Sequence, residues 1–167
     1  MITLNPGETK QINVALTPSP PPPPSPGEIA ALAVVPSPAL SWGTSESGYV
    51  IPTEGELEDA FDLDMTSFFG VKDDIQLYVQ IDFNQLVSVA TVRVGVTGRN
   101  TYPTSTFALL VSKDGVNWVE LHTWSADIYG NEPSPWVAVN DTIRYIRISH
   151  TNVYGWTLYR YCGVKLA

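Results

Sequence analysis

Residues 112–118 read S-K-D-G-V-N-W, and further along the chain residues 143–148 read I-R-Y-I-R-I. The dipeptide Asp114-Gly115 favours a tight turn, because both residue types tolerate a positive φ. Apolar residues lie on either side of it: Phe107, Leu109, Val111, Trp118, Val119 and Leu121. The first segment therefore predicts a β-hairpin, and the second predicts another strand.

The same alternation of apolar and polar residues continues along most of the chain. It covers residues 77–83, 87–96, 106–112, 118–123, 143–150 and 158–166. This period of two is typical of half-buried strands, and helical periodicity is absent. The connections are rich in Gly, Pro, Asn, Ser and Thr, as at 98–103 and 129–133. The pattern predicts an all-β fold, a jelly-roll β-sandwich over residues 29–167.

The motif S-x-D-G-x-x-W, followed by a strand with the sequence R-Y-I-R-I, resembles sequences of the discoidin or coagulation-factor C-domain family. This family includes many galactose-binding-like carbohydrate-binding modules. Three upstream landmarks follow the family's order: an acidic loop at 62–66, a strand at 78–83 and a valine-rich strand at 87–96. The resemblance covers roughly residues 29–167 and implies a discoidin-like sandwich. An unrelated antiparallel sandwich that happens to carry an Asp-Gly hairpin is the alternative.

Two further segments precede the predicted sandwich. Residues 1–17 predict a pair of short strands, which is too small to be stable alone. Its apolar residues Ile12, Val14 and Leu16 alternate with polar ones, so we expect them to pair with another subunit or with a preceding domain. Residues 18–28 form a proline-rich linker with seven prolines in 18–26. At about 3.1 Å per residue, a polyproline helix over 18–26 spans roughly 28 Å.

Composition narrows the classes of partner. The 167 residues carry a formal net charge of −8 and are 44% hydrophobic, as in one well-cored domain with a short appendage. Phosphate binding needs clustered Lys and Arg, and the nine in this chain are scattered, which argues against nucleic acid. No apolar run approaches the ~20 residues of a membrane span. We expect an extracellular, cell-surface or virion-surface protein, although residues 1–17 lack the features of a signal peptide.

Residues suited to catalysis are scarce. The two histidines, His122 and His150, lie far apart and outside any metal-ligand spacing, so we expect both on strand surfaces. Cys162 is expected to be a small buried residue. The carboxylates between Glu54 and Asp64 are interpreted as a polar surface loop rather than a glycosidase pair. The sequence therefore predicts a protein that is not an enzyme.

The family resemblance implies one metal site. Asp62, Asp64 and Thr66 look like the loop that holds a structural calcium ion in many sugar-binding members of the family. Carboxylate and hydroxyl oxygens are ligands that calcium prefers. Those members usually complete the site with an acidic residue near the last strand, whereas residues 157–167 contain no Asp or Glu. Calcium is therefore the one candidate cofactor, and this departure counts against it.

Sugar recognition combines flat aromatic faces with planar hydrogen-bonding groups. The sandwich should bring two loops of this composition together at one end, and Phe68 and Phe69 form a third wall. The predicted ligand-binding residues are Arg99, Asn100, Tyr102, Tyr154, Trp156, Phe68 and Phe69. The alternative is that these aromatic residues close the end of the sandwich or contact another subunit, because interfaces also favour Trp and Tyr.

Two functions therefore stand at this point. The first is a non-catalytic carbohydrate-binding or adhesion module, displayed outside a cell or on a virus particle. The alternative is a structural subunit of a surface layer, an extracellular filament or a virion. Such a subunit would form a homo-oligomer or filament through its N-terminal strand.

Overall fold

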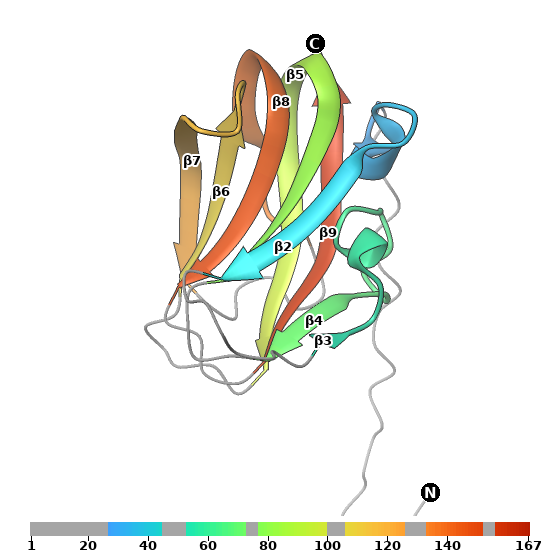
Figure 1. Cartoon of the computed structure of the whole chain (residues 1–167), viewed down its shortest axis with the longest axis vertical. Coiled ribbons are helices and arrows are strands. Elements are labelled where there is room, and N and C mark those ends of the chain that lie inside the picture. The colour runs from blue at the N-terminus through green and yellow to red at the C-terminus, as the bar shows by residue number, and fades with distance from the viewer. Residues whose placement is uncertain (1–26, 45–52, 73–76, 100–105, 126–132, 152–155) are drawn as a thin grey trace, which may run out of the picture.

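The computed structural model describes residues 27–44, 53–72, 77–99, 106–125, 133–151 and 156–167. These residues form nine strands and two 3-10 helices (Figure 1). In chain order they are β1 Ile29–Ala30, η1 Ala31–Ala33, β2 Ala39–Thr44, β3 Thr53–Glu54, η2 Leu57–Ala60, β4 Phe69–Lys72, β5 Leu77–Arg99, β6 Thr106–Ser112, β7 Trp118–Ser125, β8 Val137–Thr151 and β9 Trp156–Leu166. Within the described part of the chain, neither helix is long and apolar enough to cross a membrane. The predicted all-β sandwich is confirmed.

The predictions made for residues 1–26 concern a segment outside the described part of the chain. They include the strand pair of 1–17, the polyproline spacer and the apolar stripe Ile12, Val14 and Leu16. Pairing through the N-terminal strand therefore stays a prediction.

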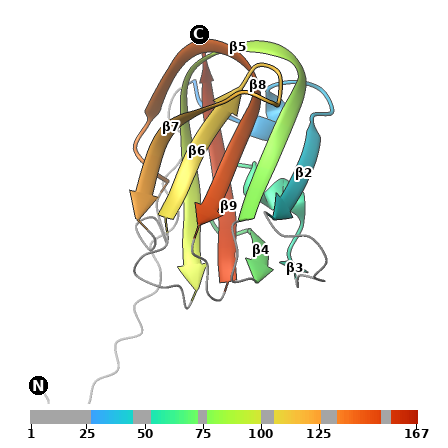
Figure 2. The ribbon, with the colours of Figure 1, turned by 60° about the vertical axis from the view of Figure 1, so that its left-hand side comes forward.

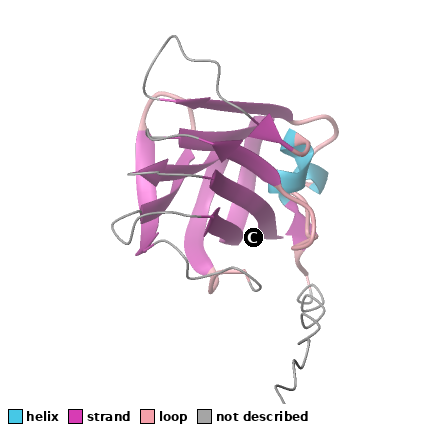
Figure 3. Ribbon diagram, turned by 90° about the horizontal axis from the view of Figure 1, so that it is seen from below, coloured by secondary structure: helices cyan, strands magenta, loops and turns pink. Residues whose placement is uncertain are grey.

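Two long strands, β5 and β8, build the sandwich by bending from one layer into the other (Figures 1 and 2). The first part of β5 pairs with β2 and β8, and its second part pairs with β9. The bends fall at Asn84 and Asn140, which have φ of 59° and 48°. Asn tolerates this left-handed conformation better than most residues. One layer thus holds β2, β8, β6 and β7, and the other holds β9, β4 and β3. Figure 3 shows the sandwich from below, with the helices at one side.

The inner faces of the two layers form the core. Along β6, Phe107, Leu109 and Val111 are buried, as the alternation predicted. Cys162 is completely buried in the same core, as expected, and burial raises the pKa of its thiol to about 12. A thiol with so high a pKa is unreactive at neutral pH.

The predicted hairpin joins β6 to β7 through residues 113–117. Asp114 Oδ1 accepts hydrogen bonds from the N–H groups of Val116 (2.9 Å) and Asn117 (2.8 Å). Ser112 Oγ donates to the carbonyl oxygen of Asn117 at 2.6 Å and accepts from the N–H of Gly115 at 2.9 Å. These bonds hold the pKa of Asp114 well below its ordinary value. The Ser and Asp of the signature segment thus build the turn.

The two signature segments meet on the outer face of the β8 layer. The Arg147 guanidinium lies 3.8 Å from the centroid of the Trp118 ring and 4.2 Å from that of Tyr78. Its Nε and Nη2 donate to Gln80 Oε1 at 3.1 and 2.7 Å. An arginine between two rings gains cation–π attraction on both faces. This contact explains why the hairpin tryptophan and the R-Y-I-R-I strand occur together in one chain.

A buried ion pair ties the start of the domain to β5 and β9. Arg93 donates to both carboxylate oxygens of Glu28, at 2.7 and 2.5 Å, and Tyr161 donates to Glu28 Oε1 at 2.6 Å. The Glu28 side chain is fully buried and that of Arg93 is 12% exposed. A Cβ on Gly163 would lie 2.0 Å from Glu28 Oε1, so only glycine leaves room here. Glu28, which the sequence placed in the linker, therefore anchors the sandwich.

Replacing Glu28 with alanine should destabilise the protein by about 3–5 kcal/mol, because Arg93 would be left as an unpaired buried charge. The matched control is Asp141→Ala. Asp141 pairs with Lys113 on the surface, with side chains 53% and 58% exposed, and such pairs contribute about 0–1 kcal/mol. Urea unfolding of the three proteins gives the comparison, and similar losses for both variants would contradict a structural role for the buried pair.

Candidate functional site

A bulge at Arg160 changes which residues of strand β9 face the core. On one side of Arg160, Cys162 and Val164 pair with Val94 and Val92 of β5 and face the core. On the other side, Tyr159 pairs with Val96, and the ladder passes over Arg160 without a partner for it. Such an extra residue shifts the alternation by one. As a result, Thr157 and Tyr159 are completely buried, and Trp156, Leu158 and Arg160 face outward.

The outward residues of β9 lie between outward residues of its two neighbours. Trp156 is directly opposite Lys72 of β4 on one side and Arg99 of β5 on the other. Directly opposite residues of antiparallel strands share a face of the sheet. We call this surface the outer platform. It comprises Phe68, Gly70, Trp156, Leu158, Arg160 and Thr97, together with the strand positions of Lys72 and Arg99 on either side of Trp156. Trp156 lies at the loop end of the sandwich, where β4 and β5 end and β9 begins.

Phe68 occupies the other end of the platform. A Cβ on Gly70 would lie 3.3 Å from the Phe68 ring and 3.0 Å from a methyl carbon of Leu158, so the ring rests on bare backbone. The Arg160 guanidinium is 5.1 Å from the ring centroid. Its Nε donates to Thr97 Oγ1 at 2.9 Å, and its Nη1 donates to the carbonyl oxygen of Met65 at 3.2 Å. Arginine and ring therefore hold each other in place on the sheet.

Some of the predicted ligand-binding residues lie together on the outer platform, and one of them lies in the core. Arg99, Trp156 and Phe68 all belong to the outer platform. Phe69 is only 4% exposed and packs against Trp42 in the core, with ring centroids 6.0 Å apart, so including it was wrong. Neighbours on a strand point to opposite faces, which is why Phe68 and Phe69 cannot share a role. Asn100, Tyr102 and Tyr154 lie outside the described residues.

Sequence reasoning missed five positions of the platform: Gly70, Lys72, Thr97, Leu158 and Arg160. A glycine within a strand marks a place of close approach, and this signal was available at Gly70. Arg160 carried no such signal, because its position depends on the bulge.

The carboxylate oxygens of the acidic loop accept hydrogen bonds from donors within the same loop. Asp62 Oδ1 accepts from the N–H of Asp64 at 2.8 Å, and Oδ2 accepts from Ser67 Oγ at 3.0 Å. Asp64 Oδ1 accepts from both the N–H and the hydroxyl of Thr66, at 2.8 and 2.6 Å. Hydrogen bonds from Thr66 lower the pKa of Asp64, whereas burial raises that of Asp62. The loop is a chain of local turns in which the carboxylates act as acceptors.

This donor set does not fit the calcium site that the resemblance implied. Calcium takes six to eight oxygens, and Asp62 and Asp64 already use three carboxylate oxygens within the loop. Within the described ranges, no three His, Cys, Asp or Glu side chains gather where they could hold a metal ion.

Adding calcium or a chelator should leave the melting temperature unchanged, because a cation stabilises a protein only if it binds the folded state. Thermal unfolding with calcium chloride and with EDTA measures this. Magnesium chloride at equal ionic strength is the control. A rise in melting temperature specific to calcium would restore the predicted site.

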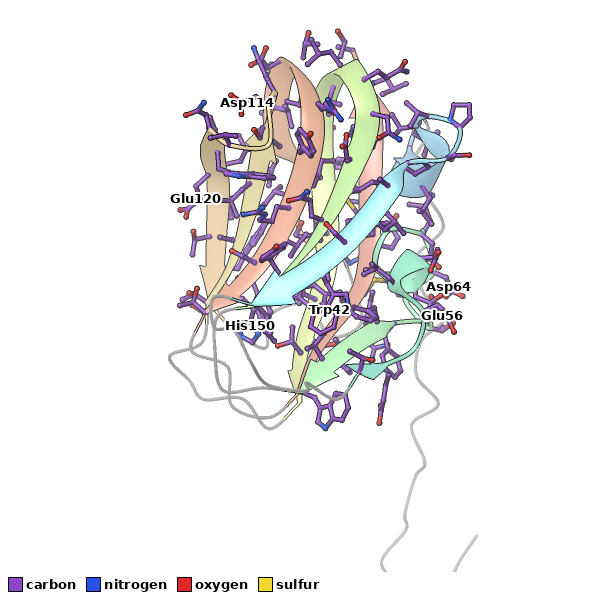
Figure 4. The ribbon with its side chains drawn as sticks, in the orientation of Figure 1. Trp42, Glu56, Asp64, Asp114, Glu120 and His150 are labelled. Atoms are coloured by element: carbon purple, nitrogen blue, oxygen red, sulfur yellow. The ribbon has the colours of Figure 1, made fainter. Side chains whose placement is uncertain are left out.

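His150 lies in the interior at the loop end, so its predicted surface position was wrong (Figure 4). It stacks on Phe107 with ring centroids 4.0 Å apart, and its Nδ1 makes a hydrogen bond with Thr157 Oγ1. Among the described residues, its Nε2 has no hydrogen-bond partner. Thr157 is the inward neighbour of Trp156, so this bond supports β9 from beneath the outer platform. His122 is exposed, as expected.

The stability of the protein should depend on pH through His150. Burial lowers its pKa to about 3, whereas an unfolded histidine takes up a proton near pH 6.5. The folded state therefore binds fewer protons between these values, and the free energy of unfolding falls as the pH drops below 6.5, by about 1.4 kcal/mol per unit. Between pH 7 and pH 5 the loss should reach roughly 2 kcal/mol.

His150→Gln should remove most of this dependence, and His122→Gln should leave it intact because His122 is exposed. Urea unfolding at pH 7, 6 and 5 gives the slopes. Equal slopes for the two variants would rule out His150 as the titrating group.

A hollow lies beside the hairpin of Asp114, at the end of the sandwich opposite His150. Figure 4 labels both residues. It has a volume of about 330 Å³ and is lined by Val111, Ser112, Lys113, Asp114, Asn117, Val119, Asp141 and Ile143. No aromatic ring lines it, and Lys113 and Asp141 bind each other at 2.9 Å. It therefore offers no stacking surface for a sugar.

Solved structures of carbohydrate-binding modules share this fold. CBM32-1 of a family 31 glycoside hydrolase from Clostridium perfringens matches with a TM-score of 0.55 and 16% identity, over 84% of this chain and 99% of that one. Chitosan-binding module 2 of a chitosanase/glucanase from Paenibacillus sp. IK-5, solved with chitotriose, matches with a TM-score of 0.55 and 17% identity, over 77% and 95%. The C-terminal domain of a chitobiase from Bacteroides fragilis gives a TM-score of 0.52 and 18% identity, over 75% and 93%.

No family model and no curated protein matches the sequence. At these identities the solved structures establish the fold alone. The chain has the discoidin, or galactose-binding-like, fold that the signature segments predicted.

Proposed function

We propose that this protein is a non-catalytic carbohydrate-binding module whose site is the outer platform at the loop end. The observation that carries the proposal is the row of Lys72, Trp156 and Arg99 across three adjacent strands. The solved structures of the same fold support it, because those proteins are named as modules that bind chitosan and other carbohydrates.

The chemistry of this row suits a sugar. An indole offers a broad apolar face to the C–H groups of a sugar ring. Lysine and arginine donate several hydrogen bonds, which the hydroxyl groups of the ring can accept. In the strand register, the half-buried Trp156 is paired with Lys72 of β4 and with Arg99 of β5. A pocket or platform that combines an aromatic surface with a few polar groups fixes both the affinity and the orientation of a ligand.

The proposal assigns no catalytic step to the protein. It places the module outside the cell or on a virus particle, where it would attach its carrier to glycans. Assembly into a filament or layer depends on residues 1–17, which lie outside the described residues, and nothing in the described part favours that role over binding.

Trp156→Ala should weaken glycan binding by tenfold or more, since removing a central aromatic side chain costs about 2 kcal/mol in typical sites. The control is Trp136→Ala. Trp136 is also half-buried, but cations already lie over its ring, with Arg93 at 4.8 Å and Lys165 at 4.4 Å from the ring centroid. A glycan array followed by titration of the strongest ligand compares the three proteins. Undiminished binding by Trp156→Ala, with unchanged thermal unfolding, would refute the site.

A further inference from the structure

The outer platform extends well beyond Trp156. Trp156 and Arg160 are four residues apart on β9, which at about 3.3 Å per residue separates them by roughly 13 Å. Phe68 lies beside Arg160, because the next residues, Phe69 and Tyr159, are directly paired. The two outward aromatic rings therefore stand farther apart than one sugar ring can span.

The surface between the two rings is low. Its middle row, across β3, β4, β9 and β5, is Glu54, Gly70, Leu158 and Thr97. Gly70 has no side chain and the edge of the Phe68 ring lies over it, Thr97 has a short side chain, and Leu158 is 7% exposed. The exposed Glu54 stands at the margin of this row. A chain molecule can therefore lie along β9 without meeting a tall side chain between the rings.

One end of the platform is closed. Met65 lies over Gly95, where its sulfur would be 2.6 Å from a Cβ, and its carbonyl oxygen accepts a hydrogen bond from Arg160. The acidic loop thus crosses the sheet beyond Phe68. A ligand on the platform is therefore bounded by this loop beyond Phe68.

The Phe68 end also carries its own recognition chemistry. Arg160 Nε donates to Thr97 and its Nη1 donates to Met65. Arg160 makes no ion pair with a described carboxylate. Its Nη2 can therefore donate to a ligand. It does so beside the flat face of Phe68. An aromatic ring next to a fixed planar donor is a combination that suits a sugar.

We infer that the ligand is an oligosaccharide of at least two sugar units that lies along β9, with one unit on Trp156 and another on Phe68 and Arg160. This inference rests on the proposed function and adds its ligand class: a chain of two or more sugar units rather than a single sugar. The acidic loop would then act as the end wall of the site.

The test is an array of graded oligosaccharides, from one to six units, of chitosan, galacturonan, mannuronan and galactan. The full-length protein is compared with Phe68→Ala, Phe68→Tyr and Arg160→Gln, each checked for thermal unfolding. Affinity should rise with length up to the units that fill both subsites. Phe68→Ala should lose about tenfold for trimers and no more than about twofold for the monosaccharide, whereas Phe68→Tyr, which keeps the ring, should bind as the parent does.

The other possible results distinguish failure of the second subsite from failure of the proposed function. Affinity that does not increase beyond one unit, or equal binding of trimers by Phe68→Ala and the parent, would overturn the second subsite and leave the Trp156 site standing. If Phe68→Ala unfolds, Arg160→Gln decides the matter by the same ratio of trimer to monosaccharide binding. Absence of binding to every sugar would reject the proposed function itself, and the second subsite with it.

Discussion

Arg160 has no paired residue on β5 in the strand register, so it forms a bulge in β9. The orientation of the side chains from Trp156 to Arg160 depends on this bulge. Counted back from the buried Val164 and Cys162, an unbroken alternation would place Arg160 in the core, followed by Leu158 and Trp156. Burying an unpaired guanidinium costs several kcal/mol, far more than a ladder irregularity. The bulge moves Arg160 to the outer face and turns Tyr159 and Thr157 inward in its place.

Both faces of β9 follow from that shift. On the inner side, Thr157 meets His150 of the opposite layer and Tyr159 fills the core beside Phe69. On the outer side, Trp156 joins Lys72 and Arg99 at the loop end. The packing that stabilises the sandwich and the surface proposed to bind sugar are therefore two sides of the same strand. The Glu28–Arg93 pair, farther along the same sheet, anchors the domain without taking part in the site.

Much of this fold could be predicted from the sequence, because period-two alternation and the Asp-Gly turn are local signals. The signature segments predicted a hairpin and a strand but not the contact that joins them, in which the Arg147 guanidinium lies over the rings of Trp118 and Tyr78. The site was only partly predictable. Trp156 and Arg99 were paired correctly because strand order brings their ends together. Phe69 and His150 were misplaced, because deciding which face a residue occupies requires the register, and bulges shift the register without a reliable sequence signal.

The most direct test of the bulge is the solvent exposure of individual tryptophans. The chain can be labelled with 5-fluorotryptophan and its five ¹⁹F resonances assigned by single Trp→Phe replacements. A soluble gadolinium chelate then broadens resonances in proportion to their exposure. Our account predicts that Trp156 is broadened strongly while Trp124, which is 6% exposed, is spared. Protection of Trp156 equal to that of Trp124 would mean that β9 continues without the bulge, and the outer platform would not exist.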